Sequence, residues 1–288
     1  MDVKHIRDVK LVSEGTLSFL AQDELRNNIP MGILDRLRNN SRTFDSYHLF
    51  VVEQAGQVGF YAHLTPPFPL CLSVGAPAAV VALVQYLKTI SLLLHEVQGP
   101  LSVVQTFLAA WPELAAHKYH EDRQGLFRLT EVTMPPATGA SWEVAQIEDL
   151  ETYAQWACHF SAETGDTSQS LEESLHGQRQ RIGARDLYCM RLDKKPVAMA
   201  TAGRRLPHGR TIGLVYTPPE HRGKGYASEL VARLSAHLLA SGNEFCALFT
   251  QLSNPTSNKI YQRMGYEWVD EFCMCKFRSP WPDQVKFP

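Results

Sequence analysis

Residues 218–228, Pro-Pro-Glu-His-Arg-Gly-Lys-Gly-Tyr-Ala-Ser, form a basic, glycine-rich segment between an apolar run and a helical pattern. The apolar run, residues 211–217, predicts a strand, and the later pattern predicts a helix that begins near Gly225. The first N–H groups of a helix have no partner within that helix, and with the helix dipole they favour an anion. Small residues also let a phosphate approach the backbone. The sequence therefore predicts a phosphate site at a strand–turn–helix junction.

The spacing of this turn differs from that of the commoner phosphate loops. It lacks both the Gly-x-x-x-x-Gly-Lys-Ser/Thr of nucleoside triphosphate loops and the three-glycine dinucleotide fingerprint. Instead, Arg222, Gly225 and Ala227 form an Arg-x-x-Gly-x-Ala pattern. A plain tight connection between a strand and a helix has a similar composition, so the neighbouring sequence has to decide between the two interpretations.

A second motif follows about thirty residues later. Residues 245–251 predict a strand, Asn254 is typical of a helix N-cap, and Gly265 is typical of a helix end. At 100° per residue, Asn254, Asn258 and Tyr261 share one narrow polar stripe on that helix. A polar stripe beside a phosphate turn is suited to contact a ligand.

Together the two motifs resemble those of the GNAT superfamily of acyl-CoA-dependent N-acetyltransferases, over roughly residues 141–278. The resemblance implies an α/β fold, a mixed sheet with flanking helices, and acetyl-CoA as the acyl donor. It implies that Tyr261 lies near the thioester sulfur as a general acid. It also implies a cofactor-binding set, in which the strand end serves the pantetheine arm, the turn serves the pyrophosphate, and the stripe adds two amides: Val215, Tyr216, Thr217, Arg222, Gly223, Lys224, Gly225, Tyr226, Ala227, Ser228, Asn254 and Asn258.

The chemistry of such a transfer needs a proton donor and a proton acceptor. Tyr261 suits the donor, because a phenol with the ordinary pKa near 10 is protonated at neutral pH; the alternative is a half-buried helix tyrosine. By residue type Glu163, Glu220 and His208 are possible bases, but each also fits an exposed surface position. A water chain is a further possibility, so no base is assigned.

The order of predicted elements repeats along the chain. A Pro/Gly-containing break at residues 134–140 indicates a linker, and we predict tandem GNAT-like domains: a degenerate domain without the CoA motif over 1–135 and a catalytic domain over 136–288. The turn at residues 73–77 of the first half has no basic residue. An unrelated α/β domain is the alternative for this half. Strands are predicted at 47–53, 58–64, 70–74, 96–100, 125–131, 141–147, 186–192, 196–205, 211–217 and 245–251, and helices at 78–90, 101–111, 148–160, 225–240 and 255–264.

Composition narrows the class of protein. A formal net charge of −2 argues against a nucleic-acid partner, since Lys and Arg supply most of that affinity. The six cysteines contain no C-x-x-C pair, and the histidines show no metal-ligand spacing, so we predict no metal. The sequence has no apolar signal core and no stretch of about 20 apolar residues. We therefore expect no membrane association and a cytoplasmic location.

The sequence favours an N-acetyltransferase that acts on a primary amine of a small molecule or peptide. It leaves the acceptor, the acyl-chain preference and the oligomeric state open. Two other function classes remain: a non-catalytic acyl-CoA-binding regulatory module, in which the phosphate turn persists without transfer, and a nucleotide-phosphate enzyme.

Overall fold

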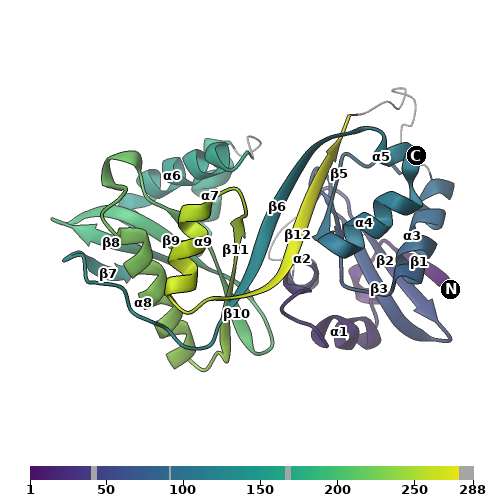
Figure 1. Ribbon diagram of the computed structural model, residues 1–288, viewed down its shortest axis with the longest axis horizontal. Coiled ribbons are helices and arrows are strands. Elements are labelled where there is room, and N and C mark those ends of the chain that lie inside the picture. The colour runs from purple at the N-terminus through teal and green to yellow at the C-terminus, as the bar shows by residue number, and fades with distance from the viewer. Residues whose placement is uncertain (40–43, 91, 166–169, 279–288) are drawn as a thin grey trace. The chain divides into compact units, whose positions relative to one another are not determined.

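The computed structural model describes residues 1–39, 44–90, 92–165 and 170–278. The chain forms two compact units, shown in Figure 1. Unit 1 comprises Met1–Leu126, Gln251–Ser253 and the residues from Val269 onward, and unit 2 comprises Phe127–Thr250 and Asn254–Trp268. The last strand thus contributes most of its length to unit 1, because it pairs there with a strand of the first half.

Unit 1 is a mixed sheet with the strand order β1-β2-β3-β4-β5-β12-β6. Most neighbouring strands pair antiparallel, whereas β4 and β5 are parallel. Its elements along the chain are β1 (Asp2–Ile6), α1 (Glu14–Ala21), α2 (Asn28–Arg38), β2 (His48–Gln54), β3 (Gln57–Leu64), β4 (Leu70–Leu72), α3 (Pro77–Thr89), β5 (Glu96–Pro100), α4 (Leu101–Ala110), α5 (Pro112–Ala115) and β6 (Lys118–Leu129), with β12 (Glu267–Phe277) added from the C-terminal end.

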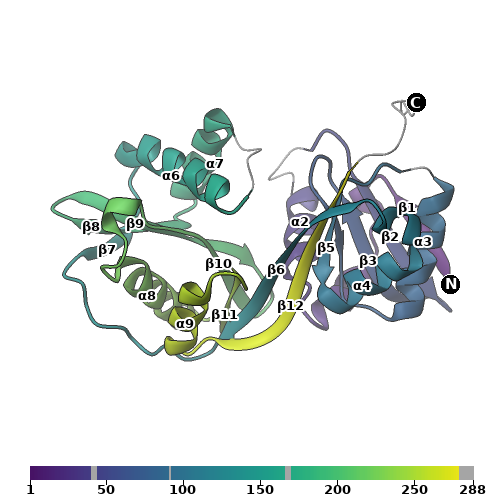
Figure 2. The same cartoon turned by 45° about the horizontal axis from the view of Figure 1, so that its top comes forward.

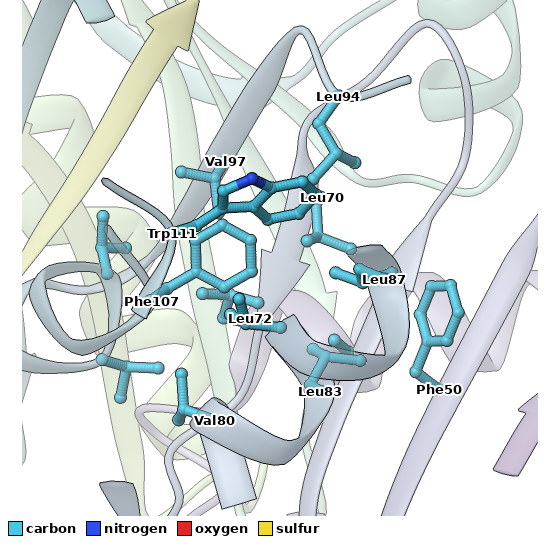
Figure 3. Close-up of a cluster of buried hydrophobic side chains, with 14 of the residues drawn as sticks. Phe50, Leu70, Leu72, Val80, Leu83, Leu87, Leu94, Val97, Phe107 and Trp111 are labelled. Carbon is cyan, nitrogen blue, oxygen red and sulfur yellow. The ribbon is translucent and has the colours of Figure 1, made fainter. Parts of the chain in front are cut away.

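The sheet of unit 1 has a hydrophobic core on each face. One core packs α3 and α4 on the sheet, and Figure 3 shows Phe107 and Trp111 beside Leu70 and Val97 within it. The other core packs α1 and α2 on the opposite face, around the fully buried Tyr61. Burial of apolar side chains on both faces explains why the central strands read as nearly continuous apolar runs.

Unit 2 has the strand order β6-β11-β10-β9-β8-β7, with β6 contributing its last residues. One core lies under α8 and α9, and the other lies under α6, so the helices cover both faces of the sheet (Figure 2). Its elements are β7 (Ser141–Val144), α6 (Leu150–Glu163), α7 (Leu171–Gly183), β8 (Leu187–Leu192), β9 (Lys195–Arg205), β10 (Gly209–Tyr216), α8 (Tyr226–Ala240), β11 (Phe245–Gln251) and α9 (Pro255–Arg263).

The two units share one order of elements: a strand, two helices, three strands, a helix, a strand, helical structure and a closing strand. The predicted mixed α/β fold with flanking helices is therefore confirmed. Sequence reasoning missed α1, α2, α5, α7, β1 and β12. For α7, Leu-Glu-Glu-Ser-Leu-His-Gly-Gln-Arg-Gln-Arg-Ile-Gly, the polar composition hides the helical period, and a capping box of Ser170 and Glu173 marks the start instead. In the described part of the chain, no helix has the length and apolar character that crossing a membrane requires.

Residues 134–140 contain no helix or strand, but they are anchored to unit 2. The backbone N–H and the hydroxyl of Thr138 both donate to Oε2 of Glu229, each at 2.7 Å. Arg233 Nε donates to the other carboxylate oxygen at 2.8 Å. Glu229 is 1% exposed and lies in the first turn of α8. The anchored segment therefore lies against the start of that helix.

We expect Glu229→Gln to lower the free energy of unfolding by about 1.5–3 kcal/mol, the range for hydrogen bonds to a charged group. Burial raises the pKa of the Glu229 carboxyl, but the bonds from Thr138 and Arg233 outweigh burial and leave this pKa lowered. The carboxylate thus stabilises the fold above its unfolded pKa of about 4.3, and this contribution is lost as the pH falls through the folded value. Urea titrations at pH 7 and pH 3 should show the difference from wild type shrinking in acid.

The matched control is Glu172→Gln, in the first turn of α7, where the side chain is exposed. Its free energy of unfolding should stay within about 0.5 kcal/mol of the wild-type value. Equal stability losses at Glu229 and Glu172 would contradict the anchoring role.

Candidate functional site

The parallel strands β10 and β11 are paired at only one end. Registered pairs join Gly209–Thr211 to Phe245–Ala247, although β10 continues to Tyr216 and β11 to Gln251. Within the described residues, no registered pair of these two strands follows Thr211 and Ala247. The carboxyl ends of both strands therefore extend beyond their shared pairing.

A β-bulge lies in the same stretch of β10. Between the pairs Gly213↔Thr201 and Tyr216↔Met199, β10 has one residue more than β9. Leu214 has φ 49°, a left-handed conformation that is rare for a side-chain-bearing residue. Bulges bend a strand and often redirect it next to a functional site. The bulge thus interrupts the regular pairing with β9 at Leu214 and Val215, and the pairing resumes at Tyr216↔Met199.

The turn after β10 has the conformation that a phosphate cradle needs. A single 3-10 turn, Pro219–His221, leads to Gly223 with φ 75° and Gly225 with φ 86°. Gly225 is the N-cap of α8 and has no side-chain cap, while the N–H of Glu229 bonds to the Gly225 carbonyl at 3.0 Å. The N–H groups of residues 226–228 precede this bond and have no acceptor within the helix. They can bind an anion at the positive end of the helix dipole.

The side chains of the predicted set contribute less than the backbone. Tyr216 and Tyr226 are 4% and 6% exposed and pack in two hydrophobic cores, so only their backbone groups are available to a ligand. Lys224 Nζ bends back and donates to the carbonyl of Glu220 at 3.0 Å. Arg222 pairs with Glu163, a contact that no sequence spacing predicts. With these side chains engaged elsewhere, the backbone N–H groups at the start of α8 are the groups that can bind an anion.

Helix α9 begins as predicted. Asn254 is its N-cap, and the side-chain oxygen accepts from the N–H of Ser257 at 3.0 Å, so its cap role is confirmed. A role of Asn254 and Asn258 toward a pantetheine arm stays a prediction. Tyr261 packs on the hydrophobic cluster under α8, and so does Val215 from the bulge of β10. The strand end and α9 thus meet on one cluster within unit 2.

The hydroxyl of Tyr261 is placed differently from that of its aromatic neighbour. The Tyr261 and Tyr266 rings lie edge to face, with centroids 5.8 Å apart. Tyr266 Oη is hydrogen-bonded to Ser235 Oγ at 2.9 Å, whereas among the described residues none bonds to the Tyr261 hydroxyl. Burial raises the pKa of Tyr261 to about 12, so the phenol holds its proton throughout the neutral range.

The structure does not single out a base among the three residues named from sequence. Both carboxylate oxygens of Glu163 accept from Arg222. Glu220 and His208 are exposed on the surface of unit 2. The general base therefore stays unassigned.

The corresponding strand–turn–helix junction of unit 1 is closed. A Cβ at Gly99 of β5 would lie 3.0 Å from the carbonyl oxygen of Leu72 in β4, so the two backbones approach closely. A Cβ at Gly75, in the turn itself, would lie 2.5 Å from Cδ2 of Phe60. This turn packs on β3, and α3 begins with Pro77, which has no N–H. These contacts leave no room for a side chain at Gly75 or Gly99, and the absence of a CoA site from unit 1 stays a prediction.

Two other features of the described residues lie away from this site. A hollow of about 530 Å³ in unit 2 is lined by residues such as Ser141 and Arg191 and contains none of the predicted residues. In unit 1, the thiols of Cys273 and Cys275 lie 3.4 Å apart, near Glu121. The Glu121 carboxylate is already bonded by two cationic side chains, so we assign no metal there.

Comparisons with known proteins agree with this architecture. Residues 191–275 match the family described as FR47-like protein. No curated protein matches the sequence. Similar solved structures include a GNAT-family acetyltransferase from Colwellia psychrerythraea, with 10% identity, a TM-score of 0.61, and coverage of 96% of this chain and 100% of that chain.

Two further structures extend over both units. A GCN5-related N-acetyltransferase from Sphaerobacter thermophilus has 14% identity and a TM-score of 0.64, covering 95% of this chain and 94% of its own. A tandem GNAT protein from the clavulanic acid biosynthesis pathway has 13% identity and a TM-score of 0.59, with coverage of 96% of this chain and 98% of that chain. With the repeated order of elements, these likenesses show that the chain has the tandem fold of the GNAT superfamily.

Proposed function

We propose that this protein is an N-acetyltransferase that moves the acetyl group of acetyl-CoA to a primary amine of a small molecule or peptide. The observation that carries the proposal is the junction of β10 and α8. There a bulged strand end outside its parallel pairing leads through two left-handed glycines to unbonded helix N–H groups. That junction offers strand-like backbone for an amide-containing arm and a cradle for a pyrophosphate.

Each part of the junction has a separate role in the proposal. The N–H groups of residues 226–228 and the open space at Gly223, where an added Cβ meets nothing within 4 Å, receive the pyrophosphate. The backbone of Val215 hydrogen-bonds the amides of the pantetheine arm, as an added strand would. Asn258, on α9, offers an amide to the same arm.

The chemistry requires the amine as its free base, which attacks the thioester carbonyl carbon. The C–S bond then breaks, and the sulfur leaves with the bonding electron pair. Tyr261 donates its phenolic proton to that sulfur, because a proton donor stabilises the charge that develops on the leaving group. The amine nitrogen loses a proton as the amide forms, and this proton returns through solvent to the Tyr261 phenolate, so the protons balance. Since its pKa of about 12 keeps it protonated, Tyr261 is in the donor form at neutral pH.

Isothermal titration with acetyl-CoA, followed by thiol detection with a panel of primary amines, tests this proposal. We expect binding of acetyl-CoA, no binding of ATP at the same concentration, and amine-dependent release of the CoA thiol. Failure to bind acetyl-CoA would contradict the proposal, and tighter binding of ATP would favour a nucleotide-phosphate enzyme.

One observation favours the alternative of a non-catalytic acyl-CoA-binding module. Of the residues named as bases, Glu163 is held in an ion pair and the other two are exposed. Binding of acetyl-CoA without thiol release, across amines and short peptides with free N-termini, would support this alternative over transfer.

We expect acetyl-CoA to bind with a stoichiometry of one per chain, because the junction in unit 1 is closed at Gly75 and Gly99. A titration that fitted two sites would show that the repeated fold carries two donor sites. The residual binding of a variant with the unit 2 site blocked, such as Gly225→Val, would then report on unit 1.

A further inference from the structure

Arg222 lies in the turn before α8, where the sequence predicted that its charge would contact a pyrophosphate. Its guanidinium instead bonds to two other parts of unit 2. Nε donates to the carbonyl of Thr217 at 2.9 Å, and one terminal nitrogen donates to Oε1 and Oε2 of Glu163 at 2.6 and 2.8 Å. The guanidinium carbon also lies 5.6 Å from the centroid of the Tyr216 ring. One side chain thus joins the turn, the end of β10 and the end of α6.

These contacts change what Arg222 offers a ligand. A guanidinium beside a carboxylate forms a nearly neutral pair, so its net attraction for a more distant anion is small. The bond to Thr217, on the other hand, closes the segment between Thr217 and Arg222 into a loop. That loop carries the strand end on one side and Gly223 on the other. The arrangement is suited to hold the turn in shape.

We propose that Glu163 is a positioning residue for acetyl-CoA, which holds Arg222 on the Thr217 carbonyl and so fixes the β10 end and the turn before the donor binds. Arg222 then acts as a brace of the cradle and does not bind the pyrophosphate itself. This inference rests on the proposed function, since it concerns the same donor site.

The two roles of Arg222 predict opposite effects of removing the Glu163 charge. If Arg222 bound the pyrophosphate, Glu163 would compete for it, and Glu163→Gln would bind acetyl-CoA more tightly. If Glu163 positions Arg222, the same substitution loosens the turn and weakens binding. The side chains of Arg222 and Glu163 are 46% and 48% exposed, and exposed pairs contribute little, so the expected change is about two- to fivefold.

The experiment measures the dissociation constant of acetyl-CoA by isothermal titration for wild type, Glu163→Gln, Arg222→Gln and the double variant. It also measures KM for acetyl-CoA and kcat with the best amine of the panel. For Glu163→Gln we expect the dissociation constant and KM to rise about two- to fivefold with kcat unchanged. Because Glu163 acts through Arg222, the double variant should bind no more weakly than Arg222→Gln alone.

Glu151→Gln is the matched control, since it makes the same substitution at an exposed position of the same helix, α6. It should leave the dissociation constant unchanged, and circular dichroism should show all variants folded. Tighter or unchanged binding by Glu163→Gln, or additive losses in the double variant, would overturn the inference alone. A wild-type chain that fails to bind acetyl-CoA would overturn the proposed function and this inference with it.

Discussion

Gly225→Val should abolish acetyl-CoA binding while the protein stays folded. Gly225 has φ 86° at the N-cap of α8, and a β-branched residue there adopts a strained conformation that costs about 1–3 kcal/mol. Its side chain would also extend into the space that a pyrophosphate needs in order to reach the helix N–H groups. Strain and steric blockage act on the same turn, so this substitution should have the largest effect on binding. Isothermal titration measures it directly.

Gly242→Val is the control that separates steric blockage of the phosphate site from backbone strain. Gly242 has φ 95° just after the other end of α8, and an added Cβ there meets nothing within 4 Å. This control should lose a similar amount of stability in urea and keep its affinity for acetyl-CoA. At Gly225 the added Cβ would lie 3.3 Å from Cγ2 of Thr138, a contact that a shift of a few tenths of an ångström relieves. If a folded Gly225→Val variant bound acetyl-CoA with wild-type affinity, the turn at Gly225 would not be part of the binding site.

The sequence predicted the elements whose signals are local. The strand–turn–helix around Gly225 and the cap at Asn254 depend on residues close together in the chain, and both are present as expected. Helix α7 was missed because its polar composition conceals the helical period. Strand β12, residues Glu267–Phe277, was missed because sequence reasoning ended with the last recognised motif.

Contacts between distant residues account for the rest of the site. Glu163 is 59 residues from Arg222, and Thr138 is 91 residues from Glu229. Neither pair has a spacing that a motif would detect, because the fold and not the local chain brings the partners together. The bulge at Leu214 is equally hidden, since a β-branched or leucine-rich run predicts a regular strand. Sequence thus predicted the turn at Gly225, and the structure adds the long-range contacts of Arg222 and Glu229 on either side of it.

Substitutions at these contacts and at Tyr261 should change different measured quantities. Glu229 and Thr138 support the first turn of α8, and Glu163 and Arg222 support the preceding turn, so substitutions there should act on stability or donor affinity. Tyr261 lies on a different helix, α9, and takes part in neither network. Its substitution should therefore act on turnover.

Tyr261→Phe should lower kcat and kcat/KM together, by roughly 10²–10⁴-fold as for a lost general acid, with acetyl-CoA affinity nearly unchanged. The phenol is needed only when charge develops on the leaving sulfur, so its loss raises the barrier of that step alone. The aromatic ring stays in the variant and keeps its packing against Tyr266. Steady-state thiol release and isothermal titration measure the two quantities separately.

Tyr266→Phe is the matched control, because it removes a neighbouring phenol that is bonded to Ser235. This variant should lose about 1 kcal/mol of stability with the buried hydrogen bond and keep its kcat. If Tyr261→Phe lost acetyl-CoA affinity instead, Tyr261 would be a residue that positions the donor. If Tyr261→Phe turned over as fast as wild type, the proton would have to reach the sulfur from another donor, and Tyr261 would have no part in the chemistry.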